Sequence, residues 1–523
     1  MHPVRHPLPL AGPAAPPPPP PELLAPNAGP NTFALLDFGC KTNAWDGREM
    51  RAQLLRAGLR EVDPEAARPD VVVVNSCTVT GTADREALAA IRKIRREHPA
   101  ARIVASGCMA DISPDQMLAA ARAPACVTND TPGRAADAEP LLLPTREKSR
   151  LLDHLGLTPA DAAEPPVALA APTASPLELP AGFGHSRAFV KIEDGCDLCC
   201  AFCIIPRARG TPRSRPPEEI CAEVERLAAQ GFREIILTGI HLGAYGKDFS
   251  PGAHFAGANS AKRGPNRVAE LLERLIALPT RVRFRISSLE VTEFDEHLLE
   301  LIAAAPNRIC PHLHLPLQAG DDRILKAMRR WYTRADFRAA VDRYRRAVPD
   351  GALSTDVIVG FPGEDRAAFE NTRRFLSEIA FSRLHVFPYS PREKTVAARL
   401  PGQLPWAERK ARAADLRALG VELSRAFHAA FIGRSATVVL EPHAAPRAHA
   451  ARPGAAAASA THATPAGWSP CAGYTERYIP IRTLAPAAWL RRAVHVRLGS
   501  PLPDTAADHL APALAATLGE LAD

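Results

Sequence analysis

Three cysteines near the middle of the chain have the spacing of metal ligands. Cys196, Cys200 and Cys203 follow the pattern C-x3-C-x2-C within residues 191–215. A short loop with this spacing can hold three irons of a 4Fe-4S cluster and leave the fourth iron without a protein ligand. The pattern therefore predicts a cluster loop whose open iron is a coordination site for a cofactor or substrate.

Other uses of these cysteines fit the sequence less well. A disulfide between the adjacent Cys199 and Cys200 would be strained, and nothing else in the chain indicates an oxidising compartment. A zinc site needs a fourth ligand, and no histidine lies close by in the sequence. Packing as small buried residues is a further alternative. Cys199 also opens a second frame, in which Cys196, Cys199 and Cys203 are the ligands.

Cys40, Cys77 and Cys108 form a second candidate set. Each of these cysteines closely follows a predicted strand, and the strands are residues 33–38, 71–75 and 102–106. Helical segments separate the strands, which predicts a small parallel sheet with functional loops at the carboxyl ends of its strands. We expect the three cysteines to converge at one edge of this sheet and to bind a second cluster with an open iron. The alternative is that each is a separately buried residue.

Composition limits the remaining possibilities. The 523 residues, 46% of them hydrophobic, predict two or three globular domains. Residues 1–30 are rich in proline and predict a disordered tail that is not a signal peptide. The chain contains no run of about 18 apolar residues, so we do not expect a membrane span. Eleven cysteines without an export signal favour the cytosol, and the net charge of +7 permits an anionic partner.

A larger α/β domain is predicted at residues 186–404. Six strand candidates alternate there with helical segments. The strand candidates are residues 188–192, 233–239, 281–288, 311–317, 353–360 and 383–389. Six such units predict a partial (β/α)6 barrel with its active site at the strand carboxyl ends. The cysteine loop follows the first strand. An N-terminal domain at 31–145 and a linker at 146–185 precede the barrel, and residues 249–265 are a predicted surface insertion.

The C-terminal part is predicted to be a small basic β domain. A connecting helix at 405–432 leads to strand-like segments at 433–500, which a low-complexity insertion at 443–470 interrupts, and residues 501–523 are a predicted tail. Residues 431–500 contain eight arginines, no lysine and two glutamates. A compact β-barrel with this charge is a candidate RNA-binding platform, and the alternative is an ordinary solvated face.

Four motifs carry a resemblance to a known family. They are GCKTN at 39–43, NSCTVTGTADRE at 75–86, LTGIHLGAYG at 237–246 and HLHLPLQAG at 312–320. With these motifs the chain resembles the radical S-adenosylmethionine (SAM) methylthiotransferases of the MtaB type, from residue 33 to about residue 500. The resemblance implies an N-terminal cluster domain, a radical SAM core and a C-terminal TRAM-like RNA-binding domain. It also favours Cys200 over Cys199 as the ligand.

The resemblance implies a reaction. A methylthio group would be added to C2 of N6-threonylcarbamoyladenosine beside the tRNA anticodon. The cluster of Cys40, Cys77 and Cys108 would carry sulfur, and the second cluster would use S-adenosylmethionine as a radical source. The alternatives are isopentenyladenosine tRNA or a ribosomal-protein aspartate as substrate, a radical enzyme with one cluster only, and a non-catalytic RNA-binding protein with structural metal sites.

Further roles follow from the same resemblance. Thr238 and Gly239 would lie against the amino group of S-adenosylmethionine, and Ser288, Gln318 and Ile358 near its ribose, carboxylate or adenine. The implied partners are the tRNA anticodon loop, an electron donor such as flavodoxin or ferredoxin, and a sulfur source. Four arginines after the cysteine loop could contact phosphate or be surface charges, and they are Arg207, Arg209, Arg213 and Arg215. Lys394 and Arg477 depart from the family pattern.

Overall fold

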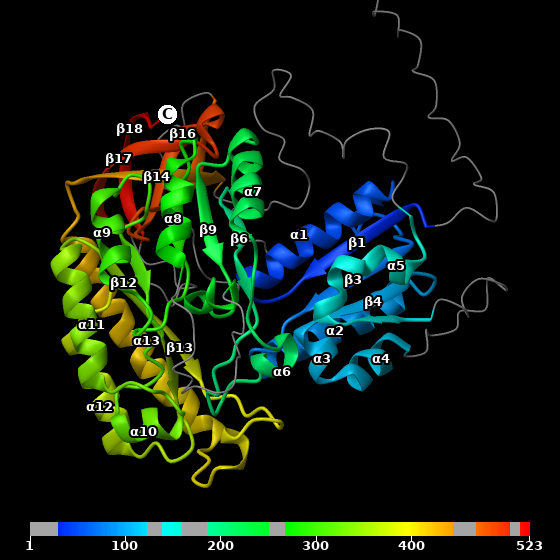
Figure 1. The fold of residues 1–523 in the computed structure, drawn as a ribbon, viewed down its shortest axis with the longest axis horizontal. Helices are drawn as coiled ribbons and strands as arrows, with labels where there is room; N and C mark the ends of the chain where they lie inside the picture. The colour runs from blue at the N-terminus through cyan, green and yellow to red at the C-terminus, as the bar shows by residue number, and fades with distance from the viewer. Residues whose placement is uncertain are drawn as a thin grey trace, which may run out of the picture.

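The computed structural model describes residues 30–122, 139–158, 186–249, 267–442, 467–502 and 513–522. The predicted tail at 1–30 and the predicted insertions at 249–265 and 443–470 fall almost entirely outside these residues. The described chain forms an N-terminal parallel sheet, a central curved sheet and a C-terminal barrel (Figure 1). None of the described helices is long and apolar enough to cross a membrane.

The N-terminal unit is a five-stranded parallel sheet in the order β2-β1-β3-β4-β5. Its middle strand has the sequence VVVVNS and is buried along its whole length, as expected of a β-branched run covered on both faces. The elements are β1 (Thr32–Asp37), α1 (Lys41–Arg56), β2 (Arg60–Glu61), β3 (Val71–Ser76), α2 (Gly81–Glu97), β4 (Arg102–Gly107), α3 (Cys108–Ile112), α4 (Pro114–Arg122) and β5 (Leu141–Leu143).

This unit extends beyond its predicted end at residue 145. A short 3-10 helix η1 (Thr145–Arg150) and the helix α5 (Leu151–Leu155) lie within the predicted linker. Leu151, Leu152 and Leu155 join the buried core on one side of the sheet, which is why this segment is folded. The prediction of a linker that starts at residue 146 is therefore wrong.

The central unit contains the six predicted strands. They form two parallel sheets, in the orders β10-β9-β6 and β11-β12-β13, and single bridges from Phe284 to Ile309 and from Ser288 to His314 join the two. The strands are β6 (Ala188–Lys191), β9 (Glu234–Thr238), β10 (Arg283–Ile286), β11 (His312–His314), β12 (Ala352–Val359) and β13 (Arg383–Pro388). The predicted partial (β/α)6 barrel is confirmed.

Helices cover the outer side of these strands (Figure 1). One large buried core fills the space between helices and strands. The helices are α7 (Pro217–Ala229), α8 (Val268–Ala277), α9 (Glu296–Ala304), α10 (Asp322–Ala327), α11 (Arg334–Ala347) and α12 (Arg366–Ile379). After β6 the chain forms a short antiparallel pair of β7 (Glu193–Asp194) and β8 (Arg213–Ser214), between which lie the cysteine loop and the helix α6 (Ile205–Arg209).

A long helix, α13 (Trp406–Ala429), leads to a closed barrel in the order β14-β15-β16-β18-β17. The strands are β14 (Ser435–Pro442), β15 (Trp468–Thr475), β16 (Pro480–Pro486), β17 (Ala493–Pro501) and β18 (Leu514–Leu521). The predicted small β-barrel is confirmed, but its predicted end at residue 500 is wrong. The strand β18 pairs with both β16 and β17 and closes the barrel, and β15 begins at Trp468, inside the predicted insertion.

We expect Leu514→Ala to destabilise the barrel. Leu514 is fully buried in the barrel core, and removing such a side chain costs about 2 to 5 kcal/mol of the free energy of unfolding. Hydrogen exchange resolved by peptide should show faster exchange in β16, β17 and β18 only. Thr517→Ala, on the exposed side of the same strand, is the control and should change little. Unchanged protection in Leu514→Ala would contradict the role of β18 in closing the barrel.

Candidate active site

Cys40, Cys77 and Cys108 lie at the carboxyl ends of three neighbouring strands, β1, β3 and β4. Gly39 has a positive φ of 95°, and a side chain there would overlap Cys77, so the backbone beside Cys40 passes directly against Cys77. Burial, together with the neighbouring Cys40 and Cys108, raises the pKa of the Cys77 thiol to about 11. The structure thus brings the three cysteines together at one edge of the sheet.

Cys196, Cys200 and Cys203 also come together. Burial raises the pKa of the Cys203 thiol, and the nearby Cys200 and Cys196 add to this effect. Arg330 donates a hydrogen bond to Cys200 Sγ at 3.2 Å. Cys199, in contrast, is exposed and donates a long hydrogen bond to the carbonyl of Asp197 at 3.9 Å. This geometry favours the frame of Cys196, Cys200 and Cys203.

The spacing of the sulfur atoms fits a cluster better than a single ion. Four thiolates at 2.3 Å around one zinc would stand about 3.8 Å apart. Among the described residues, neither triplet of cysteines has all three sulfurs within 4.8 Å of one another. A 4Fe-4S cluster holds its three ligands around a larger body, so its ligands stand further apart than those of a single ion.

His241 lies beside Cys196 in the folded chain. The sequence alone did not identify it as a residue of this site. The donor atoms of Cys196, Asp197 and His241 are within 4.8 Å of one another, so the expectation that no histidine is near the cysteine loop is wrong for the folded chain. Both ring nitrogens of His241 face carboxylates, Nδ1 at 3.3 Å from Asp197 and Nε2 at 2.8 Å from Glu293. Although burial lowers the pKa of His241, Glu293, Asp197 and Cys196 raise it well above its usual range.

The residues assigned to the cofactor by resemblance lie at the carboxyl ends of the barrel strands. Thr238 ends β9, and its hydroxyl shares a hydrogen bond of 3.4 Å with Thr42 of α1. A side chain at Gly239 would crowd Glu193, which accepts hydrogen bonds from the backbone N–H groups of residues 240 and 241. Ser288 and Gln318 follow β10 and β11, and Ile358 is half-buried on β12.

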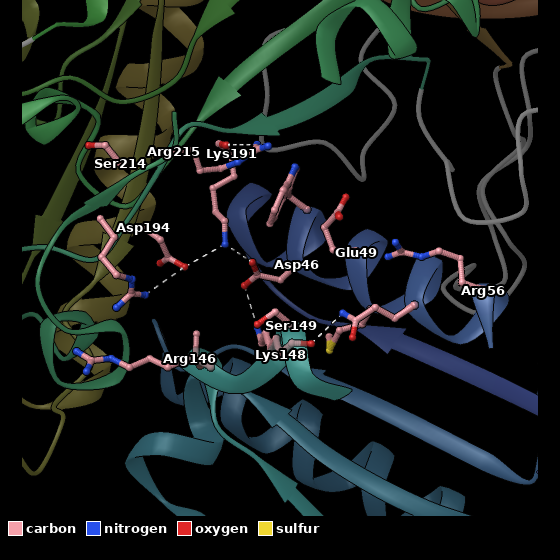
Figure 2. Close-up of a pocket in the computed structure, with 15 residues that line it drawn as sticks. Asp46, Glu49, Arg56, Arg146, Lys148, Ser149, Lys191, Asp194, Ser214 and Arg215 are labelled. Atoms are coloured by element: carbon pink, nitrogen blue, oxygen red, sulfur yellow. Dashed lines mark hydrogen bonds and ion pairs between the residues drawn. The ribbon is translucent and has the colours of Figure 1, made fainter. Parts of the chain in front are cut away.

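A buried network of charges joins the two units. Arg209 is fully buried and donates to Asp194 at 2.8 Å, to Asp46 at 3.0 Å and to Cys108 Sγ at 3.3 Å. Lys191 and Lys148 also contact Asp46, at 2.5 and 2.9 Å (Figure 2). Burial acts to raise the pKa of Asp46, but these cations hold it far below its usual range. Arg209 is therefore committed to protein contacts, and the phosphate role considered for it is wrong.

The other three arginines after the cysteine loop differ from one another. Arg207 is exposed, Arg213 is about half-exposed, and Arg215 pairs with Glu223 at 2.7 Å. Beside the charge network lies a cavity of about 600 Å³, lined by α1, η1, β6 and the residues around β8 (Figure 2). None of the six candidate cluster ligands lines this cavity, so it is separate from both cysteine sets.

A second contact between the units involves one of the residues that depart from the family pattern. Lys394 donates to the carbonyl of Ile112 in α3 at 2.7 Å. In the same loop, Arg392 pairs with Asp84 at 2.7 Å and donates to Thr78, the residue after Cys77. The loop thus clamps the cysteine edge of the N-terminal sheet onto the barrel.

We expect Arg209→Gln to destabilise the interface between the units. The substitution leaves Asp46 and Asp194 buried with fewer cations, and breaking such a pair costs about 3 to 5 kcal/mol. Denaturant unfolding followed by tryptophan fluorescence should show it, because Trp45 lies against Lys191 in this interface. Arg207→Gln, two residues earlier and exposed, is the control with a shift within about 0.5 kcal/mol. Equal stability of the two variants would refute the role of Arg209.

Comparison with known proteins agrees with both units. A model of the Radical SAM superfamily matches residues 190–376, and the model described as Uncharacterized protein family UPF0004 matches residues 32–128. The Threonylcarbamoyladenosine tRNA methylthiotransferase MtaB of Thermotoga maritima is 33% identical over 78% of this chain and 86% of its own length. That of Bacillus subtilis is 34% identical over 76% and 82%.

A relative from a sister branch is equally similar. The tRNA-2-methylthio-N(6)-dimethylallyladenosine synthase 1 of Mycobacterium marinum is 35% identical over 73% of this chain and 70% of its own length. The matched segments contain both cysteine triplets, the second of which lies in the loop between β6 and α6. This chain belongs to the radical SAM methylthiotransferase family.

Proposed function

We propose that this chain attaches a methylthio group to N6-threonylcarbamoyladenosine beside the anticodon of tRNA, in the cytosol. The observation that carries the proposal is the contact of Arg209 with Cys108. Arg209 ends the helix that begins two residues after Cys203, so one side chain joins the loop of one cysteine triplet to a member of the other. A reaction that needs two clusters near one substrate requires such a fixed arrangement.

The two cysteine triplets would each hold a 4Fe-4S cluster, Cys40, Cys77 and Cys108 in the first and Cys196, Cys200 and Cys203 in the second. When bound with S-adenosylmethionine, these groups supply the radical and sulfur chemistry that an unactivated aromatic C–H bond requires. The protein holds the ligands in place: Arg330 donates to Cys200, and Arg209 to Cys108. Thr238, Gly239, Ser288, Gln318 and Ile358 would bind S-adenosylmethionine at the strand ends.

The substrate base lies in a single-stranded loop, where it can enter a pocket without melting a duplex. The C-terminal barrel would contact the RNA with its exposed basic residues, such as Arg497 on β17. Arg477 does not belong to this surface, because it donates to the carbonyl of Asp350 and fixes the barrel on the central unit. The electron donor, a flavodoxin or ferredoxin, and the sulfur source would act at the same site from solution.

We expect 2-methylthio-N6-threonylcarbamoyladenosine to vanish from total tRNA when the gene is deleted. Nucleoside mass spectrometry measures this directly. Complementation with Cys200→Ala should leave the nucleoside absent, because a cluster ligand is lost, whereas Cys199→Ala should restore it, because Cys199 is exposed and outside the triplet. Loss of the dimethylallyl derivative instead would assign the chain to the sister branch. Unchanged thiomethylation of all tRNA would refute the proposal.

We expect about eight irons per chain, as two 4Fe-4S clusters require, in anaerobically prepared protein. Cys77→Ala should lower the content to about four, because it removes a ligand of one cluster only. Iron and acid-labile sulfide assays give both numbers. Cys310→Ala, which removes a buried cysteine outside both triplets, is the control. About four irons in the unaltered protein, unchanged by Cys77→Ala, would indicate a single cluster, and zinc without sulfide would indicate structural metal sites.

A further inference from the structure

The inner face of the barrel at β12 and β13 is polar and partly open. These strands are parallel and in register, so Asp356 pairs with His385 and Ile358 with Phe387 on one face. Alternate residues of the two strands, among them Val357, Val359 and Val386, belong to the buried core. On the inner face Ile358 is only half-buried, and Phe387 is 40% exposed. Side chains on this face are therefore partly accessible to solvent.

Basic side chains gather near the amino ends of the barrel strands. Three guanidinium groups surround the ring of Tyr478, those of Arg285, Arg383 and Arg187, at 4.6, 5.6 and 5.8 Å from its centre. Tyr478 belongs to the turn between β15 and β16, and its ring stacks on His312 at 5.2 Å. The C-terminal barrel thus covers the amino ends of the strands of the central unit. The ring of Tyr478 lies there, with three guanidinium groups around it.

Two of these arginines have acidic partners and one does not. Arg285 pairs with Glu234 at 2.9 Å, and Arg187 with Glu441 at 3.3 Å. Within the described residues Arg383 has no hydrogen-bonded or ion-paired partner, and its Nε is buried without one. A buried guanidinium N–H without an acceptor costs free energy, so the site is poised for an acceptor that the protein itself does not supply.

Lys41 reaches the same region from the N-terminal unit. It follows Cys40 directly, burial lowers the pKa of its amino group, and its charged neighbours include Tyr478, Arg285 and Asp356. No acidic group among the described residues is within ion-pair distance of its amino group. Lys41 therefore adds a second basic group without an ion pair among the described residues, on the side of the barrel where the first cysteine triplet lies.

Two other groups respond to this surplus of positive charge. Burial acts to raise the pKa of Tyr478, yet its pKa is lowered, because Arg187, Lys41, Arg285 and Arg383 favour the phenolate. Burial lowers the pKa of His385 to about 4, and Arg383 contributes. The histidine is neutral and does not add charge, but both shifts have the sign that a cationic pocket produces.

We propose that Arg383 and Lys41 bind a carboxylate inside the barrel, namely that of the threonine moiety of the substrate base. This inference rests on the proposed function. A guanidinium matches a carboxylate with two parallel hydrogen bonds, and an ammonium adds a point charge. A base with a neutral alkyl substituent would leave both cations unpaired, so the same pair would discriminate against it.

Binding of three anticodon stem-loop RNAs to the anaerobic full chain tests the proposal. The first RNA carries N6-threonylcarbamoyladenosine, the second its methyl ester and the third adenosine at that position. We expect the unaltered protein to bind the first RNA at least about tenfold more tightly than the other two, as one charge-assisted contact allows. Arg383→Gln and Lys41→Met should each reduce this preference and leave affinity for the adenosine RNA unchanged.

Arg374→Gln is the matched control, because Arg374 is exposed on the outer helix α12. It should keep the full preference. If the unaltered protein shows no preference for the first RNA, the proposed substrate fails and the carboxylate site with it. If Arg383→Gln and Lys41→Met keep the preference, the site is refuted while the substrate stands.

Two further outcomes would also overturn the proposal. An equal loss of affinity for all three RNAs would mean that the cations contact backbone phosphate, which every RNA carries. A loss of S-adenosylmethionine binding, measured by equilibrium dialysis without RNA, would assign Arg383 to the carboxylate of that cofactor. The visible absorbance of the clusters shows whether each variant is intact before either measurement.

Discussion

The placement of the two cysteine triplets depends on the burial of Arg209 between two carboxylates. A charge in the protein interior is costly unless partners surround it, and the partners here come from both units. Asp46 lies on α1 of the N-terminal unit and Asp194 on β7 of the central unit. Arg209 is satisfied only when both are in place, so the network favours one relative position of the units over all others. That position also sets Cys108 against the end of α6.

Both units are built on parallel sheets, in which functional residues lie at the carboxyl ends of the strands. This common feature explains how the two units can share a site. In each unit the functional residues lie at the carboxyl ends of the strands, and these edges face one another. Thr42 at the start of α1 contacts Thr238 at the end of β9, which marks the line where the two edges meet. The C-terminal barrel closes the opposite end of the central unit, where Arg283 and Arg285 donate to its backbone carbonyls.

Much of this arrangement could be predicted from the chain, because local pattern determines it. The strands before Cys40, Cys77 and Cys108 are apolar runs, and a parallel sheet leaves no choice about the edge at which they end. The residues that could not be predicted depend on tertiary contacts. Arg209 stands in a run of arginines that resembles an exposed basic segment. His241 is 45 residues from Cys196 along the chain, and only the folded barrel brings the two together. The strand β18 contains two alanines and a glycine and lacks strong alternation, so only its pairing with β17 and β16 reveals it.

The clamp between Arg392 and Thr78 has a consequence for the order of synthesis. The two residues are 314 positions apart. At about 5 to 20 residues per second, a ribosome needs roughly 15 to 60 s to make the intervening chain. The N-terminal unit is complete by Leu155, well before the loop with Arg392 is made. For this interval the edge with Cys77 is uncovered, so the nascent protein passes through a stage in which its first cysteine triplet is open to solvent.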